Sequence, residues 1–61
     1  MTKNQLMVKI KAARACGEAY MGDAILVYHG NEEWALYSTN GNCIDTAFGD
    51  PLKAFAYLID K

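Results

Sequence analysis

The chain has 61 residues, 52% of them hydrophobic, and its formal net charge is −1. This length allows one hydrophobic core, because a domain of this size buries only about 60% of the surface that its unfolded chain exposes. The composition predicts a single domain over residues 1–61 and excludes a membrane helix, which needs roughly 18 or more apolar residues in succession. Two cysteines, Cys16 and Cys43, make neither a disulfide framework nor a metal-ligand motif. We therefore expect free thiols and a cytoplasmic location.

A helix is predicted to begin after Thr2 and to end near Gly17. Thr2 and Gln5 have the spacing of a capping box, in which two side chains satisfy free backbone N–H groups at a helix start. Apolar residues follow with the 3.6-residue period of one helix face: Leu6, Ile10, Ala13 and Gly17. Basic residues share the opposing arc with Glu18: Lys3, Lys11 and Arg14. We interpret this arc as a solvated helix face, with phosphate binding as the alternative.

Three strands are predicted to follow the helix. The first two cover residues 24–29 and 32–38, which are rich in β-branched and aromatic residues. Gly30 and Asn31 have the pattern of a two-residue hairpin turn between them. A second turn, at residues 39–41, leads into the third strand. These elements predict an antiparallel meander.

The length of the second turn decides which side chains of the third strand face the core, because a shift of one residue exchanges the two faces of a strand. A two-residue turn would place Leu36 opposite Asp45 and mix core positions with solvent positions. A three-residue turn, with its glycine in the left-handed conformation, pairs Leu36 with Ile44 and Trp34 with Thr46. We predict the three-residue turn, which places Trp34 in the core.

A second helix is predicted to begin at Asp50-Pro51, because aspartate caps free N–H groups and proline is preset for the first helical position. Apolar residues then form one helical stripe: Leu52, Phe55, Ala56 and Ile59. The predicted fold class is α+β, in the order helix, three-stranded antiparallel meander, helix, with both helices on one face of the sheet.

Several residue types that occur in active sites are present but are predicted to lie apart. His29 is expected at one end of the second strand, and Ser38 and Cys43 near its other end, about 16 to 20 Å away. A nucleophile and its base need hydrogen-bond contact, so neither a Ser38, His29 and Asp45 triad nor a Cys43 and His29 pair is expected. The sequence has no phosphate-binding glycine motif. We predict a protein that is not an enzyme and has no cofactor and no metal.

One sheet face remains free if both helices cover the other. On the predicted register, alternation directs one set of side chains inward: Ile25, Val27, Trp34, Leu36, Ile44 and Phe48. The other set faces outward and combines tyrosines with acids, a composition typical of interfaces. From it we predict five partner-binding residues: Leu26, Tyr28, Glu33, Tyr37 and Asp45. The carboxylates favour a protein partner with a basic surface, and a homodimer through this face is a further hypothesis.

The predicted order of elements resembles the double-stranded-RNA-binding domain over nearly the whole chain. In that family a lysine-rich motif at the start of the second helix grips phosphates, whereas this chain has Asp50-Pro51-Leu52-Lys53 with one lysine. The resemblance implies our alternative function, a nucleic-acid-binding module that uses the basic first helix through Lys3, Lys11 and Arg14.

The chain also resembles, in type, the small phage-encoded anti-CRISPR proteins, which are short, acid-rich, single-domain binders. That resemblance implies a phage origin, a location in the host cytoplasm and a protein target that handles nucleic acid, such as a CRISPR-Cas subunit. Our leading hypothesis is therefore a non-enzymatic inhibitor that occludes a basic protein surface with its free sheet face.

Overall fold

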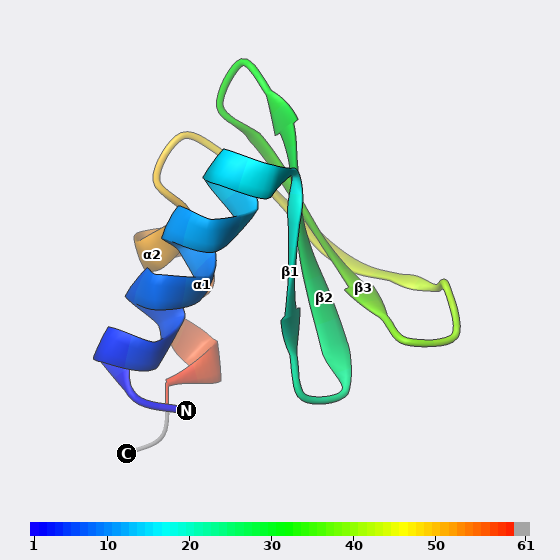
Figure 1. Ribbon diagram of the computed structural model, residues 1–61, viewed down its shortest axis with the longest axis horizontal. Helices are drawn as coiled ribbons and strands as arrows, with labels where there is room; N and C mark the ends of the chain where they lie inside the picture. Colours follow the sequence, from blue (N-terminus) through cyan, green and yellow to red (C-terminus); the bar gives the residue numbers. More distant parts are fainter. Residues whose placement is uncertain (60–61) are drawn as a thin grey trace.

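The computed structural model describes residues 1–59, and Figure 1 shows two layers, with helices on one side and an antiparallel sheet on the other. The first helix, α1 (Lys3–Cys16), begins with the predicted capping box. Thr2 Oγ1 accepts a hydrogen bond from the Gln5 backbone N–H at 3.1 Å, and Gln5 Oε1 accepts one from the Thr2 N–H at 2.8 Å. Gly17 ends the helix with a φ of 97°, a left-handed conformation that glycine adopts without strain. Both predicted ends of the helix are confirmed.

The sheet has four strands where the sequence predicted three. They are β1 (Glu18–Met21), β2 (Ala24–Gly30), β3 (Glu33–Ser38) and β4 (Cys43–Phe48), and they lie side by side in chain order. The strand missed by prediction, β1, pairs Met21 with Ala24 across a two-residue turn at Gly22 and Asp23. The α+β class is confirmed, and the three-stranded meander is corrected to a four-stranded one.

The pairing of β2 with β3 differs from the prediction by one residue. A β-bulge at His29 separates the Tyr28–Trp34 pair from the Gly30–Glu33 pair. The turn consists of Asn31 and Glu32, with φ values of 53° and 65°, and not of Gly30 and Asn31. Because one extra residue exchanges the faces of a strand, the helices cover Leu26 and Tyr28 of β2, and the prediction that Ile25 and Val27 face inward is wrong.

The predicted three-residue turn is confirmed, because Ser38 N–H donates to the Asn42 carbonyl and Gly41 has a φ of 95°. The pairing of β3 with β4 is shifted beyond it. Leu36 pairs with Asp45 and Trp34 with Ala47, so the predicted pairs of Leu36 with Ile44 and Trp34 with Thr46 are wrong. A bulge lies between the Leu36–Asp45 pair and the next pair, in which Cys43 faces Tyr37, and Ile44 is the extra residue. Ile44 and Phe48, both predicted to face the core, are exposed as a result.

The second helix begins as predicted but ends early. In α2 (Pro51–Ala54) the Asp50 carboxylate accepts hydrogen bonds from the backbone N–H groups of Leu52 and Lys53, at 3.0 and 3.4 Å. After Phe55 the chain continues as a short 3₁₀ helix, η1 (Ala56–Leu58). Within the predicted apolar stripe Phe55 is fully buried, Leu52 and Ile59 are half-buried, and Ala56 is exposed.

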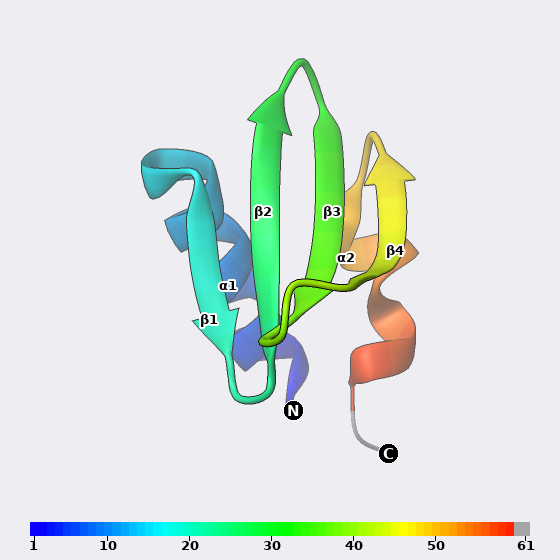
Figure 2. The ribbon, with the colours of Figure 1, turned by 90° about the vertical axis from the view of Figure 1, so that its right-hand side faces the viewer.

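The core lies between the helices and one face of the sheet. Figure 2 looks onto the opposite face and shows both helices behind the sheet, which confirms that they cover the same side. The core brings together apolar side chains of α1, the strands and the C-terminal segment: Leu6, Ile10, Ala13, Ala19, Met21, Leu26, Trp34, Leu36 and Phe55. Trp34 is buried as predicted. No helix among the described residues combines the length and apolar character needed to cross a membrane.

Candidate binding surface

The face of the sheet that the helices leave uncovered, which we call the outer sheet face, carries large apolar side chains. The strand registers assign to it these residues: Glu18, Tyr20, Ile25, Val27, Glu33, Ala35, Tyr37, Cys43, Thr46 and Phe48. The exposed fraction is 76% for Phe48 and 59% for Tyr20, and Ile44 in the neighbouring bulge is 53% exposed. Large apolar groups clustered on a surface are typical of a binding site.

Cross-strand pairing arranges these side chains in rows. Tyr20 pairs with Ile25, and Ile25 pairs with Tyr37, so an aromatic, an aliphatic and a second aromatic side chain lie in line across three strands. At the far end of β3, Phe48 pairs with Glu33. Directly paired side chains have Cβ atoms roughly 5 Å apart. The outer sheet face thus offers an apolar row near one end of the sheet and, near the other end, its most exposed ring with an acid beside it.

Charge is separated between the two layers of the molecule. Residues 18–48, which form the four strands and their turns, contain five acids and no lysine or arginine. Residues 3–16, which form α1, contain four basic residues and no acid. Because residues 18–48 carry acids without lysine or arginine and α1 carries bases without acids, the sheet favours the approach of positive groups, and α1 favours the approach of negative ones.

The structure divides the five predicted partner-binding residues between the two faces of the sheet. Tyr37 and Glu33 are on the outer sheet face, as predicted. Leu26 has an exposed fraction of 0% and belongs to the core, so its predicted exposure is wrong. Tyr28 and Asp45 also lie on the helix side, because their strand partners are the core residues Trp34 and Leu36. The cause is the pair of bulges, which exchange the faces of β2 and β4.

Tyr28 and Asp45 hold the two layers together. The Tyr28 and Trp34 rings lie 4.5 Å apart between centroids, and the Arg14 guanidinium lies over both rings. The Tyr57 hydroxyl of η1 donates a hydrogen bond of 2.7 Å to the Asp45 carboxylate. Partial burial, this hydrogen bond and the negative charge of Asp45 together raise the pKa of Tyr57 to about 12.

Sequence reasoning missed Tyr20, Ile25, Val27 and Phe48 as members of this surface. Tyr20 was missed because β1 was not recognised, although alternation of Ala19 and Met21 with exposed residues, followed by Gly22-Asp23, is a hairpin signal. The other three were assigned to the core through the one-residue error in register.

The residues considered for catalysis are not brought together. His29 lies in the bulge near the end of β2, whereas the Ser38 hydroxyl, at the end of β3, hydrogen-bonds within its own turn to Asn40 and to the Asn42 backbone. Cys16 and Cys43 are free thiols, as predicted. Within residues 1–59, no three His, Cys, Asp or Glu side chains come together in the way that metal binding needs.

No family model, curated protein sequence or solved structure significantly matched this chain. The function must therefore be argued from the surface itself.

Proposed function

We propose that this chain is a non-enzymatic binding protein that docks its outer sheet face on a basic surface of another protein and inhibits that protein by occlusion. The observation that supports this most is the uncovered apolar row of Tyr20, Ile25 and Tyr37, together with the exposed ring of Phe48 near the other end of the same face. Aromatic side chains supply large contact areas and dominate binding energy when they fill pockets on a partner.

Charge supports a basic protein surface as the target. The acids of the outer sheet face, Glu18 on the edge strand β1 and Glu33 on the inner strand β3, both lie closer to the β2–β3 turn than the apolar row does, and no strand contributes a lysine or arginine. Such a surface mimics the charge of a phosphate backbone, so a protein region that grips nucleic acid is the kind of surface it fits. Under this proposal a CRISPR-Cas subunit is one such target, and the chain acts as an anti-CRISPR protein in the host cytoplasm.

Affinity capture with matched variants tests this function. Tagged parent protein, a double variant with Tyr20→Ser and Phe48→Ser, and a control with Ala12→Ser and Ala15→Ser on α1 should be compared in bacterial lysate. All four side chains are exposed, so each variant should keep the fold, which thermal melting can verify. The proposal expects one stoichiometric partner that the parent and the α1 control retain and the outer-face variant loses. Adding the parent protein should then block nucleic-acid binding by that partner.

The opposite pattern would favour the alternative, a nucleic-acid-binding module. All four basic residues that precede the strands lie on α1, which is the observation in its favour. In that case Lys11→Glu with Arg14→Glu would abolish binding to duplex RNA, and the outer-face variant would bind like the parent. A parent protein that self-associates through this face, and loses that association in the outer-face variant, would instead support the homodimer.

A further inference from the structure

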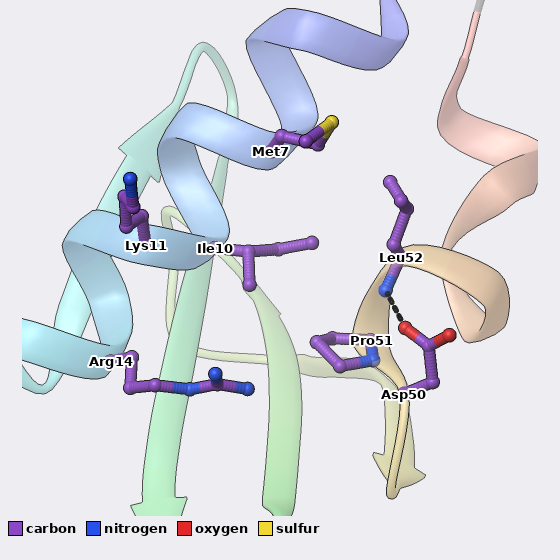
Figure 3. Close-up of a pocket in the computed structure, with 7 residues that line it drawn as sticks. All are labelled: Met7, Ile10, Lys11, Arg14, Asp50, Pro51 and Leu52. Carbon is purple, nitrogen blue, oxygen red and sulfur yellow. Dashed lines mark hydrogen bonds between the residues drawn. The ribbon is translucent and has the colours of Figure 1, made fainter.

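A groove in the helix layer lies between α1 and the start of α2 and is a candidate for a second binding site (Figure 3). Its volume is about 260 Å³, and we call it the helix groove. Two buried residues line it from opposite helices, Ile10 from α1 and Pro51 from α2, and Met7 and Leu52 complete an apolar lining. Drug-sized ligands occupy pockets of about 300 to 1,000 Å³, so the helix groove suits one apolar side chain and a small polar group.

Two cations stand on the α1 side of the helix groove, Lys11 and Arg14. The Arg14 guanidinium carbon lies 5.8 Å from the centroid of Tyr28 and 5.4 Å from that of Trp34. Cation–π attraction to two rings holds the guanidinium in place, and within residues 1–59 no acceptor engages its N–H groups. A fixed fork of unused N–H donors is the arrangement that binds a carboxylate through two parallel hydrogen bonds.

Asp50 adds a negative charge to the α2 side of the helix groove. Its carboxylate stands on the α2 side and accepts the backbone N–H groups of Leu52 and Lys53. An anionic group is therefore repelled from that side and drawn toward Arg14, while the apolar part of the ligand lies against Pro51 and Leu52. Two cations and one acid leave the lining with one net positive charge, which matches a monoanion.

A second hollow extends the helix groove along α1. It is lined by Asn4, Met7, Val8 and Lys11, so it shares Met7 and Lys11 with the first. Met7 and Val8 are large apolar side chains exposed on the surface of α1. The two hollows together are longer than a short free carboxylic acid would occupy. They leave room for a peptide chain that continues from a carboxylate bound at Arg14.

We propose that the helix groove binds the C-terminal residue of a protein partner, with an apolar side chain against Ile10 and Pro51 and the terminal carboxylate on Arg14 and Lys11. The preceding residues lie along Met7 and Val8. None of the residues of the outer sheet face lines the helix groove, so this proposal stands or falls independently of the occlusion function.

An NMR titration of the full chain tests it with the peptide acetyl-Ala-Val-Leu, which ends in a free carboxylate. The comparison ligands are the same peptide as its C-terminal amide, and hexanoate. We expect saturable amide shifts confined to residues 4–14, 50 and 52, since Pro51 has no amide proton. The carboxylate peptide should bind about tenfold tighter than the amide, the difference expected when a charge-assisted hydrogen bond is lost. Equal binding of the amide, or hexanoate binding as tightly as the peptide, would overturn the assignment, and so would an absence of saturable shifts.

Variants separate recognition by Arg14 from general charge attraction. Arg14→Lys keeps the charge and removes the fork, and Lys11→Met removes the other cation at the groove. The matched control is Lys3→Met, which removes an exposed α1 cation that does not line the groove. Peptide affinity should fall about tenfold in the first two variants and stay unchanged in the control, with thermal melts confirming the fold. Equal losses of peptide affinity in all three variants would show that the peptide is attracted to the charge of α1 as a whole, and would refute a specific site in the helix groove.

Discussion

Asp45 and Tyr57 form a contact between β4 and η1 whose strength depends on pH. The pKa of Tyr57 is raised to about 12, chiefly by partial burial and then by the hydrogen bond to Asp45, whereas an unfolded tyrosine titrates near 10. The folded chain therefore keeps a proton between about pH 10 and 12 that the unfolded chain loses. The stability from this contact is complete below about pH 10 and is lost as the pH rises toward 12.

Urea unfolding at pH 9 and pH 11 measures this effect. The free energy of unfolding should fall between the two pH values by more in the parent than in Tyr57→Phe, because the variant has no phenol to titrate. The difference between the two proteins removes the contribution of the lysines and the other tyrosines. An identical fall in both would show that the Tyr57 proton is not retained on folding.

Trp34 fills the centre of the core, yet its indole N–H has no hydrogen-bond partner among the described residues. Trp34→Ala should lower the free energy of unfolding by about 3 to 5 kcal/mol through the cavity it leaves. Trp34→Phe should cost much less, because the ring refills most of the site and a buried unpaired donor, worth about 1 to 3 kcal/mol, is removed. Urea unfolding of both variants, with exposed Ile44→Ala as a control, checks this order. Equal losses would mean that the indole N–H is satisfied.

At the scale of elements, the ends of the helices follow from a few residues, and the strand registers do not. The Thr2 and Gln5 capping box, the Gly17 stop and the Asp50-Pro51 start were predictable because each relies on side-chain chemistry next to the element. A bulge depends on the fit of a whole strand against its neighbour and adds only one residue. Near His29 the sole local sign of a bulge in the sequence is Gly30, and near Ile44 there is none. The candidate surface was therefore predicted with the two faces of β2 and of β4 exchanged.

Deleting single residues of β2 tests the role of the His29 bulge. Without His29 the ladder becomes regular, since Tyr28 still pairs with Trp34 and glycine still pairs with Glu33. This deletion should change the free energy of unfolding by only about 0.5 kcal/mol, the range of ordinary surface changes. Deleting Val27 instead should cost more than about 4 kcal/mol, because it reverses the faces of part of a paired strand. Urea unfolding distinguishes the two, and similar losses would argue against a bulge at His29.

At the scale of the whole molecule, charge and apolar surface combine differently on the two sides. The strands carry acids without lysine or arginine and hold the exposed rings of Tyr20 and Phe48, whereas α1 carries bases without acids and lines a groove. This separation was predictable in part, because the basic run in residues 3–14 and the acids after it are visible in the sequence. Which aromatic residues accompany the acids was not, because the register assigns them.

The two kinds of residue on the outer sheet face should affect different steps of binding to the captured partner. Charges at the edge of an interface mainly steer the approach, whereas buried aromatic anchors set the lifetime of the complex. Glu18→Lys with Glu33→Lys should therefore slow association and weaken its dependence on salt, with a smaller effect on dissociation. Phe48→Ala should speed dissociation and leave association almost unchanged. Biolayer interferometry at two salt concentrations measures both rates, with Lys3→Glu and Lys9→Glu on α1 as the matched charge reversal. If reversing the α1 charges slows association while reversing the sheet acids does not, the partner approaches the helix side, and the outer sheet face is not the surface that binds it.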